Sequence, residues 1–224
     1  MPSTVLRLCC AFFSPRKGTA FLSHLETTRI YNGKTMSHLE ISSKKLQAIQ
    51  TAIQLITIHG FHNVGVDMIA REAKITKGTL YKYYHSKEHL IEMCIVFQKS
   101  LLREEVLGII YSSRYYTAKD KIKQIIVLHT NLNSLYNLLL KAIFEIKLIH
   151  PKAYSMAVEY RKWLHHEIFD LIFSGEIREP QFDANMVVNL IDGLLLQALG
   201  SQSLEERDVV LDYFLNSFAR NFSP

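Results

Sequence analysis

The chain has 224 residues, of which 48% are hydrophobic and 21% charged, and it contains only nine glycines and five prolines. This composition favours an all-α protein, with one generous helical domain or a small head and a larger body. No run approaches the ~18 consecutive apolar residues of a membrane span, so we predict no membrane association. Three cysteines, two of them adjacent, make no disulfide framework and fit a reducing cytoplasm.

The net charge of +5 is unevenly distributed. Residues 1–35 carry +4, residues 36–90 carry +3, and residues 91–224 carry −2. This distribution is expected when only the N-terminal end of a protein meets a polyanion such as DNA. A surplus of +3 over 55 residues does not by itself exclude a chance imbalance.

Residues 1–35 show no sustained hydrophobic period. Their apolar run VLRLCCAFF is interrupted by Arg7 and lacks a small-residue cleavage site, so a signal peptide is not predicted. We expect a disordered or weakly helical extension. A basic arm that touches the DNA backbone or minor groove is the functional alternative.

Three helices are predicted in the next part of the chain. The first follows an N-cap at Ser42 or Ser43 and ends at Gly60. It carries one apolar stripe, formed by Leu46, Ile49, Ile53 and Ile56. Two short helices follow over residues 66–73 and 77–84, with a tight turn at Lys74 and Ile75 between them and Thr76 as an N-cap. Such a pair of short helices is typical of a helix-turn-helix.

The second short helix suits the DNA major groove. Eight residues at ~1.5 Å rise make it about 12 Å long, close to the ~12 Å groove width. Leu80 is expected to face the preceding helix, while Gly78 would let a phosphate backbone approach. We predict DNA contacts from Val66, Thr76, Lys77, Gly78, Thr79, Tyr81, Lys82, Tyr83 and Lys87. Lys77 and Thr79 would read base edges, unless they are only solvated helix residues, and Tyr81, Lys82, Tyr83 and Lys87 would bind phosphates.

A long helix is predicted from Ser86, its N-cap, to about Tyr111, and it would bridge head and body. Leu90, Cys94, Phe97 and Leu101 share one face of it. Five further amphipathic segments cover residues 118–132, 134–149, 151–173, 184–199 and 204–221, and Pro151 suits the first turn of its helix.

The last two segments predict a dimer. MVVNLIDGLLLQALG is apolar nearly all round and needs burial on two sides, and the segment after it adds a second apolar face. A C2 dimer interface of two helices from each subunit would bury the apolar faces of both segments. The predicted interface residues are Leu190, Gly193, Leu194, Tyr213, Phe214 and Phe218. Gly193 is equally well explained as a tolerated glycine in a core helix.

Residues 69–91, IAREAKITKGTLYKYYHSKEHLI, closely resemble the helix-turn-helix of TetR-family transcriptional regulators. The resemblance extends back through Ala48, Ala52, Ile56, Gly60 and Phe61 and covers about residues 43–92. It implies about nine helices, with a three-helix head and a C-terminal antiparallel bundle. It also implies a homodimeric repressor that binds a near-palindromic double-stranded operator and is released by a small-molecule effector.

Two positions depart from the family pattern. Gly65 stands where Thr or Ser usually caps the first short helix, and it makes a weaker cap. Lys74 stands where the turn usually has Gly, so we expect a strained backbone if φ is positive there.

The resemblance also implies a division of the chain. Family members usually begin near Met36, so residues 1–35 are interpreted as an extension upstream of the natural start. Residues 36–88 would form the DNA-binding domain and residues 89–224 the effector-binding and dimerisation domain.

The body should hold an effector pocket, for which the sequence offers aromatic and polar candidates. These are Phe97, His129, Tyr136, Phe144, Tyr160, Trp163 and His166, each of which also suits an ordinary core or surface position. The adjacent His165 and His166 point about 100° apart on a helix and have no supporting ligand, so neither a metal site nor a cofactor is predicted.

Two other classes of function are an enzyme and a DNA-organising protein. The chain has no G-x-S-x-G, G-x-x-x-x-G-K or H-E-x-x-H motif, and we therefore do not predict an enzyme. A ligand-independent DNA-organising protein could use the same head and the same dimer. Genomic footprints would separate the two: a few palindromes near its own gene indicate a regulator, and many dispersed sites indicate an organiser.

Overall fold

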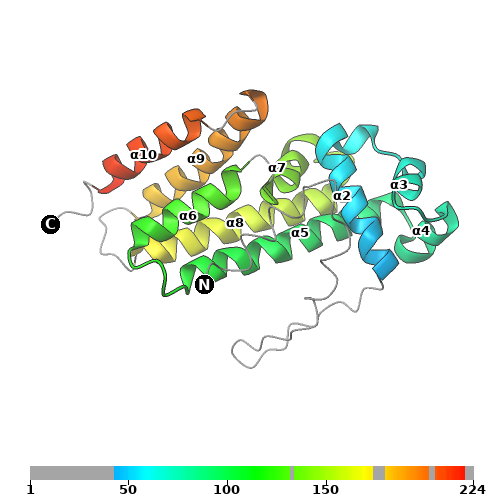
Figure 1. Cartoon of the computed structure of the whole chain (residues 1–224), viewed down its shortest axis with the longest axis horizontal. Coiled ribbons are helices and arrows are strands. Elements are labelled where there is room, and N and C mark those ends of the chain that lie inside the picture. The colour runs from blue at the N-terminus through cyan, green and yellow to red at the C-terminus, as the bar shows by residue number, and fades with distance from the viewer. Residues whose placement is uncertain (1–42, 132–133, 174–179, 202–204, 220–224) are drawn as a thin grey trace. The chain divides into compact units, whose positions relative to one another are not determined.

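The computed structural model describes residues 43–131, 134–173, 180–201 and 205–219 (Figure 1). Within these ranges the chain forms nine α-helices and no strand, which confirms the predicted all-α fold. The helices are α2 (Ser43–Asn63), α3 (Val66–Glu72), α4 (Lys77–Tyr84), α5 (Lys87–Ile110), α6 (Ala118–Thr130), α7 (Tyr136–Glu145), α8 (Pro151–Phe173), α9 (Pro180–Ser201) and α10 (Glu205–Ala219). The predictions for residues 1–35, Met36 and Ser42 lie outside the described residues.

The first helix, α2, packs on α3, α4 and α5 to make the core of the head. Its predicted apolar stripe is buried, with Ile49 and Ile56 fully covered. At Gly60 the backbone leaves helical geometry, with φ 80° and ψ 165°, and the chain continues in a short turn to Asn63. The predicted end of the regular helix at Gly60 is therefore confirmed.

Side-chain caps set the starts of the next helices. Thr76 Oγ1 accepts the Thr79 N–H at 3.0 Å at the start of α4, and Ser86 Oγ accepts the His89 N–H at 3.1 Å at the start of α5. Both predicted N-caps are confirmed. Gly65 makes no side-chain cap for α3, as expected for a residue without a side chain.

The body is built around α8, which packs on both α5 and α9, and Figure 1 shows these long helices side by side. Tyr160, Leu164 and Ile168 of α8 are fully buried in this core. Pro151 opens α8, as predicted. The helix α7 contacts α2 and so links body to head. Among the described residues, no helix is both long and apolar enough to cross a membrane.

Two helices differ most from their predicted bounds. The helix α9 covers Pro180–Ser201 instead of the predicted residues 184–199, and α7 covers Tyr136–Glu145 instead of the predicted residues 134–149. Ile149 N–H and His150 N–H both return to the Ile146 carbonyl, at 3.2 and 2.9 Å, so the chain turns there before α8. The turn follows from tertiary packing, because residues 147–149 are exposed while Ile146 is buried. Apolar periodicity alone continued the helix too far.

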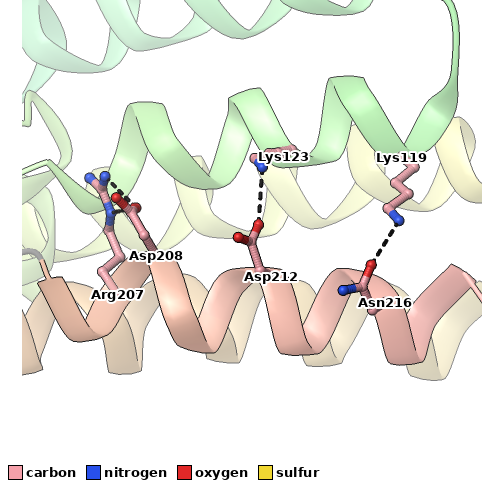
Figure 2. Close-up of polar contacts among 6 residues, drawn as sticks. All are labelled: Lys119, Lys123, Arg207, Asp208, Asp212 and Asn216. Carbon is pink, nitrogen blue, oxygen red and sulfur yellow. Dashed lines mark hydrogen bonds and ion pairs between the residues drawn. The ribbon is translucent and has the colours of Figure 1, made fainter.

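The last helix, α10, packs on α6 along a partly polar seam (Figure 2). Leu211 and Leu215 are buried there. Lys123 Nζ lies 3.1 Å from Asp212 Oδ1, and Lys119 Nζ donates to Asn216 Oδ1 at 3.4 Å. Two polar contacts therefore join α6 to α10. This packing sets which edge of α10 stays uncovered.

Candidate nucleic-acid interface

The turn between α3 and α4 has the geometry of a helix-turn-helix. Lys74 adopts φ 54°, in the left-handed region, so the strained backbone expected at this position is present. The reversal is closed by two backbone hydrogen bonds, from Lys74 N–H to the Arg71 carbonyl at 3.1 Å and from Ile75 N–H to the Ala70 carbonyl at 3.0 Å. These bonds satisfy carbonyls that the end of α3 would otherwise leave open.

The two faces of α4 separate cleanly. Leu80 and Tyr84 are buried, and the Tyr84 hydroxyl donates to the Lys45 carbonyl at the start of α2. Burial raises the pKa of Tyr84 well above its usual range, so its hydroxyl keeps the proton. The predicted contacts Lys77, Gly78, Tyr81 and Lys82 are exposed, and Val66, Thr79 and Tyr83 are half-buried. A helix is thus anchored on one side and presents donors on the other.

Two of the predicted base readers have partners within the head. Lys77 Nζ lies 2.8 Å from Asp67 Oδ1 of α3, and the hydrogen bond with this carboxylate raises the pKa of Lys77. The hydroxyls of Thr76 and Thr79 lie 2.8 Å apart, within hydrogen-bonding distance. Both side chains are therefore held in place without DNA, and their roles stay predictions.

Lys87, a predicted phosphate contact, is engaged elsewhere. Its Nζ donates to the Phe61 carbonyl at 3.1 Å, and the side chain is half-buried. The sequence placed Lys87 correctly at the start of α5 but contained no signal for this long-range partner.

The structure also places residues near α4 that sequence reasoning missed. Lys45 Nζ lies 5.7 Å from the centroid of the Tyr84 ring, so its positive charge sits beside α4. His85, between α4 and α5, adopts φ 60°. In the sequence, only the adjacent lysines Lys44 and Lys45 indicated a positive charge at the start of α2. The positive φ of His85 is typical of a short connection between two helices.

Four of the seven effector-pocket candidates come together in the body, and we call His129, Tyr136, Tyr160 and Trp163 the aromatic cluster. Ring centroids are 5.1 Å apart for His129 and Tyr136, 5.9 Å for Tyr136 and Tyr160, and 5.5 Å for Tyr160 and Trp163. His129, Tyr136 and Tyr160 have no exposed surface. The cluster is therefore a packed part of the core.

The polar atoms of His129, Tyr136 and Tyr160 in the aromatic cluster are paired. Burial lowers the pKa of His129 to about 4, so the ring is neutral. Its Nδ1 lies 2.7 Å from the Ile125 carbonyl and must carry the hydrogen, so Nε2 accepts from the Tyr160 hydroxyl at 2.8 Å. Tyr136 donates to Asp192 Oδ1 at 2.7 Å, and Asp192 Oδ2 pairs with Arg161 Nε at 2.7 Å.

The other three candidates are not in the aromatic cluster. Phe144 is 64% exposed and His166 is exposed beside Asp170, while Phe97 is half-buried on α5. Phe144 and His166 do not line an enclosed pocket in this conformation, because their side chains are exposed. The role of these three residues in effector binding stays a prediction.

The predicted dimer residues differ in exposure. Gly193 and Tyr213 are exposed, Leu190 and Phe214 are half-buried, and Leu194 is only 3% exposed. The Phe218 side chain lies outside the described residues. Val209, which the sequence assigned to the apolar face of the last segment, is exposed. Three neighbouring apolar side chains that the sequence did not single out are also exposed, namely Met186, Leu196 and Val210.

The geometry of α2, α3 and α4 defines a helix-turn-helix DNA-binding domain, and the comparisons agree. Residues 48–94 match the sequence model of the family described as "Bacterial regulatory proteins, tetR family". This part of the chain is therefore a TetR-type DNA-binding region, as the resemblance predicted.

Relatives extend the likeness over most of the chain. The fatty acid metabolism regulator protein of Bacillus subtilis is 25% identical over 179 residues, covering 78% of this chain and 91% of that protein. A TetR transcriptional regulator from Legionella pneumophila superposes with a TM-score of 0.71 at 19% identity, covering 80% of this chain and 99% of that one. A regulator from Rhodococcus sp. Rha1 gives a TM-score of 0.69 at 13% identity, covering 79% and 95%. These two structures establish the shared fold.

Proposed function

We propose that this protein is a homodimeric repressor whose α4 enters the major groove of a near-palindromic operator and which a small-molecule effector releases. The observation that carries the proposal is the division of α4 into a buried face with Leu80 and Tyr84 and an exposed face with Lys77, Tyr81 and Lys82. Donors on a rigid, anchored helix are suited to base edges and phosphates. Residues 36–88 form the DNA-binding domain in this proposal, and residues 89–224 the regulatory one.

Individual roles follow from position on α4. Lys77 and Thr79 read base edges, and Tyr81, Lys82 and Tyr83 bind phosphates. Lys87 would bind a phosphate with a donor that its hydrogen bond to the Phe61 carbonyl leaves available. Gly78 supports close approach of the DNA backbone, because a Cβ there would have only Thr76 Oγ1 within 4 Å, at 3.9 Å. Stability does not require a glycine at this position, so its lack of a side chain suits contact with a ligand.

Dimerisation is supported by the uncovered edges of α9 and α10. One edge of α10 is bonded to α6 through Lys123 and Asp212 (Figure 2). Val209 and Tyr213 of the same helix are 71% and 74% exposed, so they are not covered by α6. On α9, Met186 and Leu196 are 42% and 47% exposed. Burial of such apolar surface by a second copy would fix two heads at one spacing, which multiplies specificity.

The effector site is proposed at the aromatic cluster. It combines a largely apolar surround with a few paired polar atoms, which is the usual make-up of a small-molecule site. Because the aromatic cluster is packed, an effector must displace side chains to enter, and that displacement would pass to the adjoining helices.

The test is fluorescence anisotropy with near-palindromic duplexes from the region upstream of the gene, against scrambled duplex, at two salt concentrations. A Tyr81→Ala, Lys82→Ala double variant should lose tight, salt-sensitive, selective binding. Tyr116→Ala, Lys162→Ala removes the same side-chain types from exposed body positions and should bind like wild type. Equal binding to scrambled DNA would favour a DNA-organising protein, and no binding would refute a DNA-binding role.

A further inference from the structure

The end of α7 reaches the end of α2 through one carboxylate. Glu145 Oε2 accepts the Phe61 backbone N–H at 3.0 Å, across 84 positions of sequence. His62 Nε2 also lies 3.3 Å from the Glu145 carbonyl oxygen. A body residue therefore holds two consecutive residues of the head.

Gly60 makes this contact possible. Its φ of 80° turns the chain out of helical geometry, so Phe61 N–H points to a side chain rather than back into α2. A Cβ at Gly60 would lie 3.1 Å from Glu145 Oε2, which is too close for an undisturbed carboxylate. The glycine serves both the backbone conformation and the approach of Glu145.

The other side of Phe61 is held by the helix that follows α4. Lys87 Nζ donates to the Phe61 carbonyl at 3.1 Å, and Lys87 is the first residue of α5. The Phe61 side chain is buried in the head. Phe61 is thus fixed to α7 through its N–H, to α5 through its carbonyl, and to the head core through its ring.

We propose that Glu145 is a positioning residue for operator binding: by accepting the Phe61 N–H, its carboxylate fixes the angle at which the body presents α4. This inference rests on the proposed function and concerns its regulation. The helix α7 begins at Tyr136 of the aromatic cluster and ends at Glu145. If α7 moves as one short rigid helix, a shift of Tyr136 at the aromatic cluster also moves Glu145, and with it the end of α2 at Phe61.

Three full-length variants test the inference: Glu145→Ala, Glu145→Gln and Glu145→Asp. Each is measured for affinity to operator and scrambled duplex, for melting temperature, and for hydrogen exchange at the Phe61 amide. Glu145→Ala removes the acceptor and should expose the Phe61 amide to exchange. Its operator affinity should fall roughly 2- to 30-fold, the range for residues that modulate coupling between sites, with little change on scrambled DNA. Glu145→Gln keeps an acceptor oxygen, so it should retain most of the Phe61 amide protection and most of the operator affinity.

Glu159→Ala is the matched control. Glu159 is an exposed body carboxylate whose pairing with Lys99, 3.2 Å away, joins α5 to α8 and does not touch the head. The Glu159→Ala variant should bind operator as selectively as the wild type does.

The inference is overturned by any folded variant that loses Phe61 protection while it binds operator like wild type. If Glu145→Ala does not fold, the same comparison of Phe61 amide protection with operator affinity is made in Glu145→Gln and Glu145→Asp. Wild-type protein without preference for the operator would instead overturn the proposed function and the role of Glu145 with it. The two failures are therefore distinguishable.

Discussion

The ammonium group of Lys77 lies 2.8 Å from a carboxylate oxygen of Asp67, so the first residue of α4 is ion-paired with the second residue of α3. Both side chains are more than half exposed, at 52% and 75%. Such a surface pair contributes little to stability, because water screens the two charges and both side chains lose conformational freedom. Its larger effect is electrostatic, because it neutralises a cation on the face that is proposed to meet DNA.

Asp67→Asn should therefore tighten DNA binding. Freed of its carboxylate, Lys77 can neutralise one more phosphate, and the slope of log affinity against log salt should steepen by about 0.9. Anisotropy titrations at several salt concentrations measure this slope. Glu72→Gln removes a carboxylate that pairs with Arg71 on the same helix, and it serves as a comparison. A weaker complex with an unchanged slope would mean that Asp67 orients Lys77 rather than masking it.

Gly78→Ala should separate stability from function. Alanine in the first turn of α4 is expected to raise the free energy of unfolding by up to about 1 kcal/mol, because it has the higher helix propensity. Operator affinity should fall, since the new methyl group stands where the DNA backbone approaches. Gly108→Ala in α5, where a Cβ would also meet nothing within 4 Å, should stabilise the protein without affecting DNA. Denaturant unfolding and anisotropy give the two readouts, and unchanged affinity in Gly78→Ala would contradict a close approach.

Tyr213→Glu should dissociate the dimer. The Tyr213 side chain is 74% exposed in the single chain, so the substitution leaves the fold intact but places a charge in the proposed apolar interface. Analytical ultracentrifugation should show a monomer, and affinity for the palindrome should drop more than affinity for a half-site. Tyr116→Glu changes a tyrosine that is also largely exposed, at 91%, but lies outside that interface, and this variant should remain dimeric. A dimeric Tyr213→Glu protein would place the interface elsewhere.

Acid should destabilise the protein through His129. The pKa of this buried ring is about 4 against an ordinary 6.5, so the unfolded chain binds its proton first as pH falls. Stability is thus fully present above pH 6.5 and declines towards pH 4, by at most about 3 kcal/mol from this residue. Chemical denaturation from pH 7.5 to pH 4 measures the loss. His129→Gln should flatten the profile and His166→Gln, at an exposed position, should not; equal slopes in both variants would refute the assignment.

Much of the head could be predicted because its signals are local. Thr76 and Ser86 cap helices within three residues of themselves, and the strain at Lys74 follows from the residue type in a short turn. Local hydrogen bonds and steric limits need no knowledge of distant residues. The same holds for Leu80, whose burial follows from its place on the helix. The burial of Tyr84 was implied by the family resemblance.

The effector candidates show where that reasoning fails. Tyr136 and Tyr160 were chosen for residue type alone and prove to be adjacent, yet Phe144, chosen in the same way, is exposed. Residue type says that a side chain can line a pocket, whereas helix packing decides which way it points.

By itself, the sequence determined an all-α protein with a helix-turn-helix over residues 66–84, since these features depend on periodicity, caps and turn chemistry between near neighbours. Its motif also carried the resemblance to TetR-family regulators. Only the tertiary structure decided that Lys77 is paired with Asp67, that Lys87 is bonded to Phe61, and that Glu145 reaches the end of α2. These are contacts between helices whose register and distance are set by how the whole core packs. No local pattern encodes such distances, because the same residues on differently packed helices would not meet.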